Sequence, residues 1–140
     1  MAVRIRPAQT TDTEALESLF KEFFDWQLER AESIRKAICD PNAELLVAET
    51  DGELVAFVHQ VFFQDPLHAG LNSLITNLFV REKHRRRGIG SALIAKTIEN
   101  ARARAVQEIH VTTRSDNTQA IDFYKKLGFN KEGILLEMHP

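Results

Sequence analysis

The chain has 140 residues, of which 44% are hydrophobic and 27% charged, and its formal net charge at pH 7 is −2. This size and balance predict a single domain over residues 1–140, and the slight negative charge argues against general binding to nucleic acids or membranes. Cys39 is the only cysteine, so a disulfide within the chain is excluded. No run of about 18 apolar residues and no signal-peptide pattern occur, which makes the cytoplasm the expected location.

The first half of the chain predicts one strand, two helices and a β-hairpin. The capping-box pattern Thr11-Asp12-Thr13-Glu14 opens the first helix, and Asp51-Gly52 is a strong signal for the hairpin turn. Hydrophobic periodicity puts the strand at 3–6, the second helix at 27–38 and the hairpin strands at 45–49 and 54–63.

The second half of the chain predicts alternating strands and helices. The expected elements are a strand at 73–80, a helix from Gly88, a strand at 108–113, a helix at 118–127 and a final strand pair at 129–139 around Gly133. The order β-α-α-β-β-β-α-β-α-β-β predicts an α+β fold, in which helices cover both faces of a mixed central sheet.

The most informative segment is the turn from Arg85 to Gly90, which follows an apolar strand and opens a helix. The first N–H groups of a helix have no internal partner, and the helix dipole adds positive charge there, so such a turn suits a phosphate. Its Arg-x-x-Gly-x-Gly spacing fits neither a Walker A loop nor the three-glycine dinucleotide fingerprint. Taken alone, the basic run is also consistent with an ordinary solvated surface.

A second motif occupies residues 117–129, where the chain reads Asn-x-x-Ala-x-x-Phe-Tyr-x-x-x-Gly-Phe. Together with the apolar strand and the basic turn, it resembles the GNAT superfamily of acetyl-CoA-dependent N-acetyltransferases, in the family's order from about Ser73 to Met138. The resemblance implies the fold expected above and acetyl-CoA as co-substrate, with no metal. It also implies that a primary amine takes the acetyl group by direct attack in a ternary complex.

The resemblance assigns cofactor-binding roles to both motifs. The strand residues whose backbone would pair with pantetheine are Leu78, Phe79 and Val80. The N–H groups that would hold the pyrophosphate belong to Arg86, Arg87, Gly88, Ile89, Gly90 and Ser91. Arg85 would add charge to that turn or be a solvated arginine. Asn117 would cap a helix and also bond to pantetheine, and Phe123 would line the cofactor channel or pack in the core.

Tyr124 is the residue that the resemblance favours for catalysis. Expulsion of a thiolate benefits from a nearby acid, and a phenol with a reference pKa of about 10 can protonate the sulfur as it leaves. The alternative is a buried tyrosine whose hydroxyl is satisfied. Many family members carry a carboxylate base on the strand before the turn, but residues 73–78 contain none. The base therefore stays unassigned, with Glu29, His59 and His110 as candidates.

The acceptor is the least determined part of the reaction. The residues tentatively assigned to it are Trp26, Glu29 and His59. Carboxylates beside aromatic rings in the first two helices suit a small cationic amine, although a solvated acidic helix face has the same pattern. Transfer to a protein N-terminus or a lysine side chain, and a CoA-binding regulatory module without turnover, stay open as alternatives. Because family members are often dimers, a homodimer stays open as well.

Overall fold

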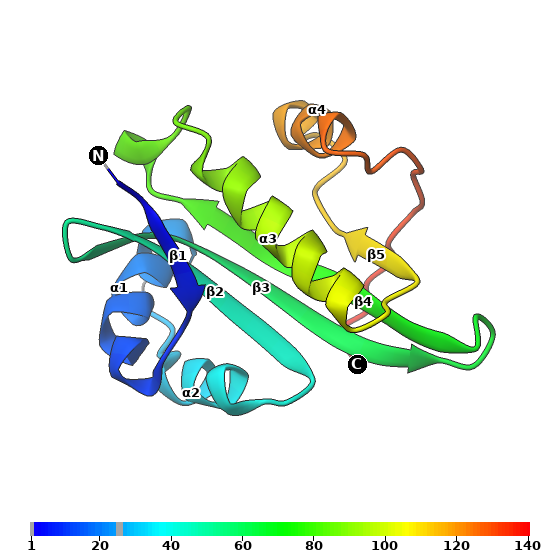
Figure 1. The fold of residues 1–140 in the computed structure, drawn as a ribbon, viewed down its shortest axis with the longest axis horizontal. Helices are drawn as coiled ribbons and strands as arrows, with labels where there is room; N and C mark the ends of the chain where they lie inside the picture. Colours follow the sequence, from blue (N-terminus) through cyan, green and yellow to red (C-terminus); the bar gives the residue numbers. More distant parts are fainter. Residues whose placement is uncertain (1, 25–26) are drawn as a thin grey trace.

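A computed structural model describes residues 2–24 and 27–140 as a five-stranded sheet with helices on both faces (Figure 1). The strands are β1 (Arg4–Pro7), β2 (Ala43–Thr50), β3 (Glu53–Asp65), β4 (Gly70–Val80) and β5 (Glu108–Val111). The helices are α1 (Thr13–Phe23), α2 (Ala31–Cys39), α3 (Ile89–Ala103) and α4 (Thr118–Lys126), with short 3-10 turns η1 (Thr10–Asp12) and η2 (Glu82–His84). No helix in this described part is long and apolar enough to cross a membrane.

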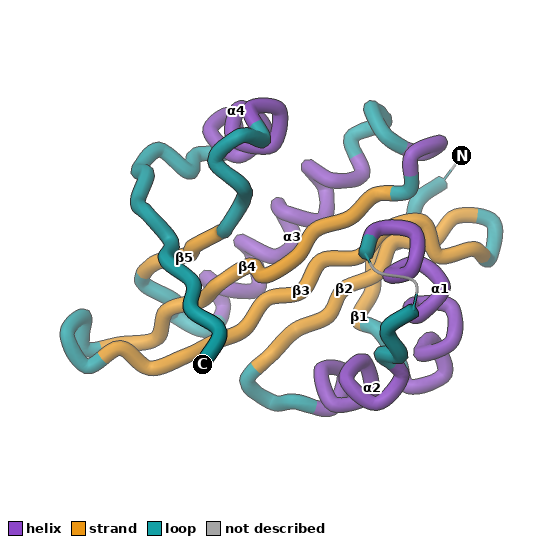
Figure 2. Tube along the Cα trace, turned by 180° about the vertical axis from the view of Figure 1, so that it is seen from behind, coloured by secondary structure: helices purple, strands orange, loops and turns teal. Residues whose placement is uncertain are grey.

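The sheet has the mixed character that the sequence predicts. Strands β1 to β4 pair antiparallel in chain order, whereas β5 pairs with β4 in parallel. Helices α1 and α2 cover one face and α3 covers the other, as the view from behind shows (Figure 2). On the first face Leu16, Ile34 and Phe57 pack together, and on the second Leu93 packs against the strands. Each of these buried side chains contributes roughly 1.5–3 kcal/mol.

Local signals fix the β2–β3 hairpin but not the start of α2. Asp51 and Gly52 have φ angles of 51° and 77°, as a tight hairpin turn requires, so the expected turn is confirmed. Helix α2 begins later than expected because one carboxylate oxygen of Glu17 accepts hydrogen bonds from the N–H groups of Arg30 and Ala31, at 2.8 and 3.1 Å. Since Glu17 belongs to α1, this boundary depends on a contact that local periodicity does not contain.

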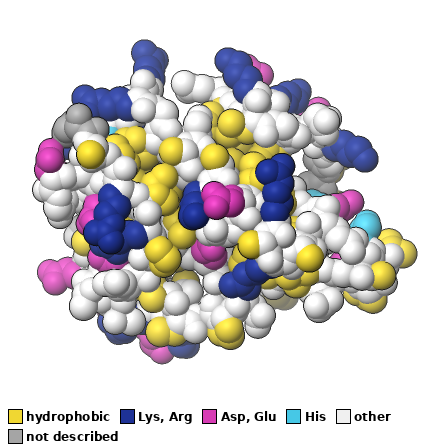
Figure 3. Space-filling view, in the orientation of Figure 1, with side chains coloured by type: hydrophobic (Ala, Val, Ile, Leu, Met, Phe, Trp, Pro, Cys, Tyr) yellow, Lys and Arg dark blue, Asp and Glu magenta, His cyan; other side chains and the backbone are white. Residues whose placement is uncertain are grey.

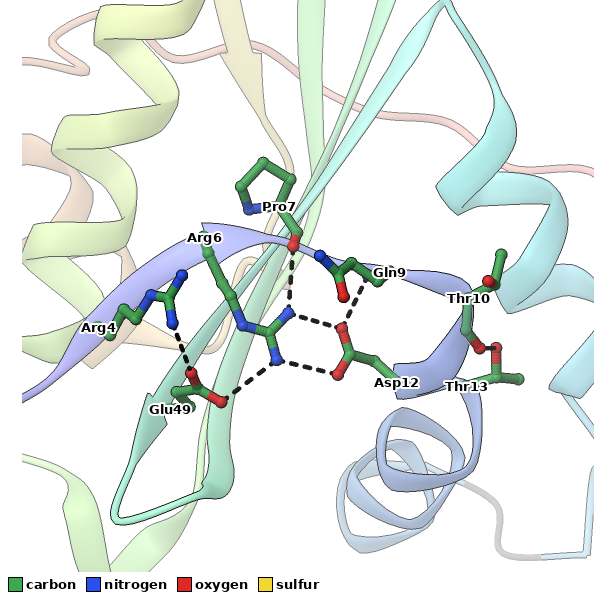
Figure 4. A network of polar contacts seen from close by, with 8 residues as sticks. All are labelled: Arg4, Arg6, Pro7, Gln9, Thr10, Asp12, Thr13 and Glu49. Carbon is green, nitrogen blue, oxygen red and sulfur yellow. Dashed lines mark hydrogen bonds and ion pairs between the residues drawn. The ribbon is translucent and has the colours of Figure 1, made fainter.

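Helix α1 also starts differently from the prediction. The capping box is formed by Gln9 and Asp12 rather than by Thr11 and Glu14, and it opens η1, the turn that precedes α1; the Gln9 N–H donates to the Asp12 carboxylate at 2.8 Å. Arg6 on β1 holds the same carboxylate with two hydrogen bonds of 2.7 and 3.0 Å, as Figure 4 shows. Asp12 therefore ties the first strand to η1, the turn that leads into the first helix.

Asp12→Asn is expected to lower the free energy of unfolding by about 2 kcal/mol at pH 7, because it breaks charge-assisted hydrogen bonds in a mostly buried pair. The hydrogen bonds from Arg6 lower the pKa of Asp12. The stabilisation is therefore present above the ordinary carboxyl pKa and is lost as the pH falls through the lowered value. Urea unfolding of both proteins between pH 7 and pH 2 measures this, and the difference between them should shrink with acid.

The matched control for this prediction is Asp116→Asn. It removes the same type of ion pair, with Arg114, from a site where both side chains are exposed, so no measurable change in stability is expected. An equal loss in the two variants would contradict the role given to Asp12.

The strand pair expected at 129–139 does not form, so this part of the prediction is wrong. Residues 128–140 join no sheet, and four apolar side chains there are between 68% and 89% exposed. The first half of the expected pair contains Asn130-Lys131-Glu132, which offers no apolar side chain to bury against the sheet. The N–H of Phe129 instead donates to the Tyr124 carbonyl at 3.1 Å, and Gly128 follows the end of α4 with a φ of 106°.

Candidate active site

The candidate site lies where β4 separates from β5. The parallel pairing of these strands ends at Ile75 on β4. The next residue, Thr76, is an extra residue in β4, because Asn77 pairs with His59 while Ile75 pairs with the adjacent Gln60. Such a bulge bends its strand and increases its twist. From the bulge to the end of β4, the edge that faces β5 has no strand partner among the described residues.

The open edge of β4 contains the three residues predicted to pair with pantetheine. Leu78 and Val80 pack with the cluster under α3, whereas Phe79 packs with the cluster under α1. Arg85 folds back over this strand: its Nε donates to the Val80 carbonyl at 2.8 Å, and its guanidinium lies 5.6 Å from the centre of the Phe79 ring. The Val80 carbonyl is thus held by the chain's own arginine, and that arginine points along β4.

The turn before α3 has the backbone geometry of an anion site. Arg86 and Gly88 are both left-handed, with φ angles of 64° and 78°. Gly88 precedes the helix with no side-chain cap, and the first helical hydrogen bond runs from the Ala92 N–H to the Gly88 carbonyl at 3.0 Å. In the described chain, no backbone partner accepts a hydrogen bond from the N–H groups of Arg86, Arg87, Gly88, Ile89, Gly90 and Ser91. These donors and the helix dipole favour a bound anion.

Only part of the basic run carries charge that is available to a ligand. Arg81 forms ion pairs with Glu22 and Glu53, so its charge is compensated within the fold. Arg86 and Arg87 are exposed on the turn itself, and neither forms an ion pair with another described residue. The left-handed backbone of Arg86 carries a strain cost of roughly 1–2 kcal/mol.

Gly90 brings the strand edge, the helix start and α4 to one place. A methyl group built on Gly90 would lie 3.4 Å from Phe123 Cζ, 3.7 Å from Val80 Cγ2 and 3.9 Å from Leu78 Cδ2. Figure 3, in the orientation of Figure 1, shows hydrophobic side chains at the surface of this face with Lys and Arg side chains around them. An unpaired strand edge, an uncapped helix start and apolar walls fit a long ligand that carries amides and phosphates, as acetyl-CoA does.

Helix α4 contributes the residues of the second motif. Asn117 caps this helix, since its Oδ1 accepts the Ala120 N–H at 3.1 Å, which confirms the capping role expected for it. The ring of Tyr124 is buried, with its centre 5.2 Å from that of Phe123 and 5.7 Å from that of Phe129. Burial raises the pKa of Tyr124 to about 12, so the hydroxyl stays protonated at neutral pH. No other described residue forms a hydrogen bond with this hydroxyl, which argues against a purely structural tyrosine.

His59 lies on β3 directly beside the bulge. Its Nδ1 is 2.6 Å from the Thr76 hydroxyl, which also accepts a hydrogen bond from Asn77 Nδ2 at 3.2 Å. Its Nε2 is buried and has no hydrogen-bond partner among the described residues. Burial lowers the pKa of His59, so the imidazole is neutral near pH 7 and can accept a proton.

A small cavity next to His59 lies between the sheet and helices α1 and α2. Its volume is about 180 Å³. The residues that line it are Phe20, Arg30, Ser33, Ile34, Ala37, Leu45, Phe57, His59 and Asn77. Sequence reasoning missed Arg30, Ser33 and Asn77, because no local pattern marks them; the bulge in β4 and the contact that starts α2 bring them together.

The other residues predicted from the sequence either do not line this cavity or lie outside the residues that the structure describes. Glu29 is exposed and does not line the cavity. His110 lies on β5, with its Nε2 3.4 Å from a carboxylate oxygen of Glu108. Trp26 lies outside the described residues. Within residues 2–24 and 27–140, no three His, Cys, Asp or Glu side chains gather closely enough to hold a metal ion.

Comparison of the chain with protein-family models tests the family relationship that the two sequence motifs indicate. The model described as the acetyltransferase (GNAT) family matches residues 13–129, a segment that includes the basic turn, the bulged strand and α4. The chain belongs to the GNAT acetyltransferase family. Both motifs named from the sequence lie inside the matched segment, so the resemblance is confirmed.

Relatives of this GNAT chain are named for amine acetylation. An N-alpha-acetyltransferase of Sulfurisphaera tokodaii is 30% identical over 105 residues, which are 66% of this chain and 60% of that protein. Human N-acetyltransferase 8 is 31% identical over 87 residues, which are 62% of this chain and 38% of that protein. The GNAT chain therefore spans only part of the length of these relatives.

Solved structures share the fold over its full length. A protein of Bacillus halodurans described as a transcriptional regulator is 27% identical, with a TM-score of 0.86 over 99% of both chains. The aminoglycoside acetyltransferase AAC(6′)-Iy, solved with the bisubstrate analog CoA-S-monomethyl-acetylneamine, is 18% identical, with a TM-score of 0.87 over 100% of this chain and 99% of that one. At such low identity, the second likeness supports the GNAT fold alone.

Proposed function

We propose that this GNAT chain is an N-acetyltransferase that transfers the acetyl group of acetyl-CoA to a primary amine. The observation that carries the proposal is the meeting of three features: the unpaired edge of β4 after Thr76, the uncapped start of α3 at Gly88 and the hydroxyl of Tyr124. They supply partners for the amides, the pyrophosphate and the departing sulfur of one ligand.

The backbone carries most of the proposed cofactor binding. The N–H groups at the start of α3 bind the pyrophosphate, and Arg86 and Arg87 add positive charge beside it. Leu78 pairs its backbone groups with the pantetheine amides, because alternate residues of β4 face the open edge whereas the backbone of Phe79 faces β3. The Val80 carbonyl already accepts a hydrogen bond from Arg85 and has a second lone pair for a pantetheine amide, so Arg85 acts on the strand rather than on the phosphate turn.

Two side chains handle the protons of the proposed reaction. The amine nitrogen bonds to the acetyl carbon, the carbon–sulfur bond breaks, and the amine proton passes to the neutral His59. Tyr124 donates a hydrogen bond to the departing sulfur. Thr76 and Asn77 fix the orientation of His59 through the shared hydroxyl. No covalent intermediate on the protein is needed.

Two other functions stay as competing proposals. The name of the Sulfurisphaera tokodaii relative favours a protein N-terminus as the acceptor. A CoA-binding regulatory module without turnover would need the same phosphate turn and strand edge but neither His59 nor Tyr124.

Micromolar binding of acetyl-CoA is the expected result of calorimetric titration, with release of free CoA when an amine is added. Thiol detection across a panel of small amines, and peptides with free N-termini, separates the three functions. Turnover of a small amine supports the proposal, and turnover of peptides alone supports the N-terminal alternative. Binding without any turnover supports the regulatory module, whereas absence of binding would contradict all three.

A further inference from the structure

The end of β4 is contacted by side chains from two other segments, which meet at Phe79. The Phe79 ring packs on the face of the sheet that carries α1 (Figure 2), and the residue is only 5% exposed. The ring of Phe23, in the last turn of α1, lies against it with 4.6 Å between the ring centres. The Arg85 guanidinium lies 5.6 Å from the centre of the same ring. Phe79 is therefore held by helix α1 and by the turn that precedes α3.

The same arginine holds a backbone group at the open edge of the strand. While its guanidinium lies over the Phe79 ring, the Nε of Arg85 donates to the Val80 carbonyl at 2.8 Å. The next residue, Arg81, donates its N–H to the Val55 carbonyl of β3 at 2.8 Å. Because alternate residues of a strand direct their backbone groups to opposite edges, the carbonyl of Val80 faces away from β3. One side chain thus connects the buried ring to the carbonyl at the open edge.

A polar contact joins the same two elements on the other side of Val80. Arg81 donates hydrogen bonds to both carboxylate oxygens of Glu22, from Nε at 3.2 Å and from Nη2 at 2.7 Å. Glu22 directly precedes Phe23 in the last turn of α1. Two consecutive residues of α1 therefore contact the residues on either side of Val80.

We propose that Phe23 and Arg85 are positioning residues for the pantetheine arm of acetyl-CoA. Through their shared contact with Phe79, they hold the Val80 carbonyl at the open edge of β4 before the cofactor binds. Binding then costs less, because a strand edge that is already ordered loses little conformational freedom. This inference rests on the proposed N-acetyltransferase function and gives the last turn of α1 a part in cofactor binding.

The test compares two ligands that share the phosphates and differ in the pantetheine arm. Acetyl-CoA and 3′-phospho-ADP, which has the pyrophosphate but no pantetheine, are titrated calorimetrically into the unmodified protein and each variant. Phe23→Leu should raise the Kd for acetyl-CoA about 3- to 10-fold and leave that for 3′-phospho-ADP unchanged. Phe63→Leu is the control, since Phe63 is similarly exposed (41% against 44%) and pairs with Asn72 near the start of β4. It should change neither Kd.

Two variants of Arg85 separate its action on the strand from direct binding of a phosphate. Arg85→Gln should weaken acetyl-CoA binding about 3- to 10-fold and leave 3′-phospho-ADP binding unchanged. Arg85→Lys should not restore the affinity, because an ammonium group lacks the planar fork that covers the ring while its Nε donates. An arginine that bound phosphate would instead affect both ligands, and lysine would replace it. Arg102→Gln, which removes an exposed arginine from the last turn of α3, is the control.

A double-mutant cycle tests whether the two residues act through the same ring. Phe23→Leu combined with Arg85→Gln should raise the Kd for acetyl-CoA by clearly less than the product of the two single effects, because either change alone releases Phe79. Effects that multiply fully would mean that the two residues act independently. Both side chains are exposed, so the variants should stay folded, and urea unfolding of each one verifies this.

Separate readouts distinguish the failure of this inference from the failure of the proposed function. Unchanged acetyl-CoA affinity in Phe23→Leu, equal weakening of both ligands in Arg85→Gln, or fully multiplicative effects would overturn the inference and leave the N-acetyltransferase proposal standing. Failure of 3′-phospho-ADP to bind the unmodified protein would also overturn it, since the phosphate turn would then not bind independently of the strand edge. Absence of acetyl-CoA binding to the unmodified protein would overturn the proposed function, and the inference with it.

Discussion

Gly88→Glu is expected to weaken acetyl-CoA binding by at least about 100-fold. The substitution puts a carboxylate at the start of α3, where the uncapped N–H groups are proposed to hold the pyrophosphate. Two charge-assisted hydrogen bonds at about 1.5 kcal/mol each already account for such a loss, before like-charge repulsion is added. Calorimetric titration of the variant with acetyl-CoA measures the change in Kd.

A matched variant separates the loss of acetyl-CoA binding from the backbone strain that glutamate causes at a left-handed position. Gly88 has a φ of 78° and Gly52 a φ of 77°, and a Cβ at either position meets no other atom within 4 Å. Glutamate should therefore lower stability equally at both, by roughly 1–2 kcal/mol. Gly52 lies in the β2–β3 hairpin, away from α3, so Gly52→Glu should bind acetyl-CoA normally. Unchanged affinity in Gly88→Glu would show that the phosphate is bound elsewhere.

Sequence reasoning succeeded where the structure depends on neighbouring residues. The turn at Asp51-Gly52, the left-handed Gly88 before α3 and the Asn117 cap follow from backbone preferences within a few residues. The uncapped start of α3 follows in the same way, because a glycine there has no side chain with which to cap the helix. Phosphate binding at this turn stays a prediction. These features could be named without knowledge of the distant parts of the chain.

The residues around the cavity beside His59 could not be predicted in this way. The bulge at Thr76 exists only in the pairing of β4 with β3, and it turns His59 and Asn77 toward α2. The position of Arg30 depends on Glu17, which belongs to a different helix. These positions depend on the register between distant strands and on the contact between two helices. Residue type alone therefore identifies His59 only as one of several polar candidates.

The final strand pair failed for a related reason. The apolar run Ile134-Leu135-Leu136 resembles a strand, but a strand also needs a neighbour against which its apolar side chains are buried. The first half of the expected pair is polar, and β5 itself pairs with β4 over only four residues. Local propensity without a paired surface therefore leaves these side chains exposed.

Tyr124→Phe is expected to lower kcat by about 10- to 100-fold while leaving the Kd for acetyl-CoA unchanged. Burial raises the pKa of Tyr124 to about 12, about 3.5 units above the reference value of roughly 8.5 for a thiol. Full proton transfer to a departing thiolate would then be uphill by roughly 5 kcal/mol. Tyr124 is therefore expected to act by donating a hydrogen bond to developing negative charge, worth about 1.5–3 kcal/mol.

The pH dependence of kcat tests this distinction. The phenol of Tyr124 stays protonated until about pH 12. Its ionisation should therefore not lower kcat between pH 8 and pH 10, so the pH profiles of the unmodified protein and of Tyr124→Phe should have the same shape in that range. A falling limb with an apparent pKa near 10, absent from the variant, would instead mean that Tyr124 titrates normally in the working complex.

The hydroxyl can be separated from the packing of the ring. Tyr124→Phe keeps the ring contacts with Phe123 and Phe129, and the hydroxyl has no hydrogen-bond partner among the described residues, so stability should not change. Phe129→Leu is the complementary variant, because it disturbs the packing around Tyr124 but keeps the hydroxyl. If kcat falls in Tyr124→Phe and much less in Phe129→Leu, the effect belongs to the hydroxyl group. A comparable fall in both would assign it to packing, and the departing sulfur would then depend on water.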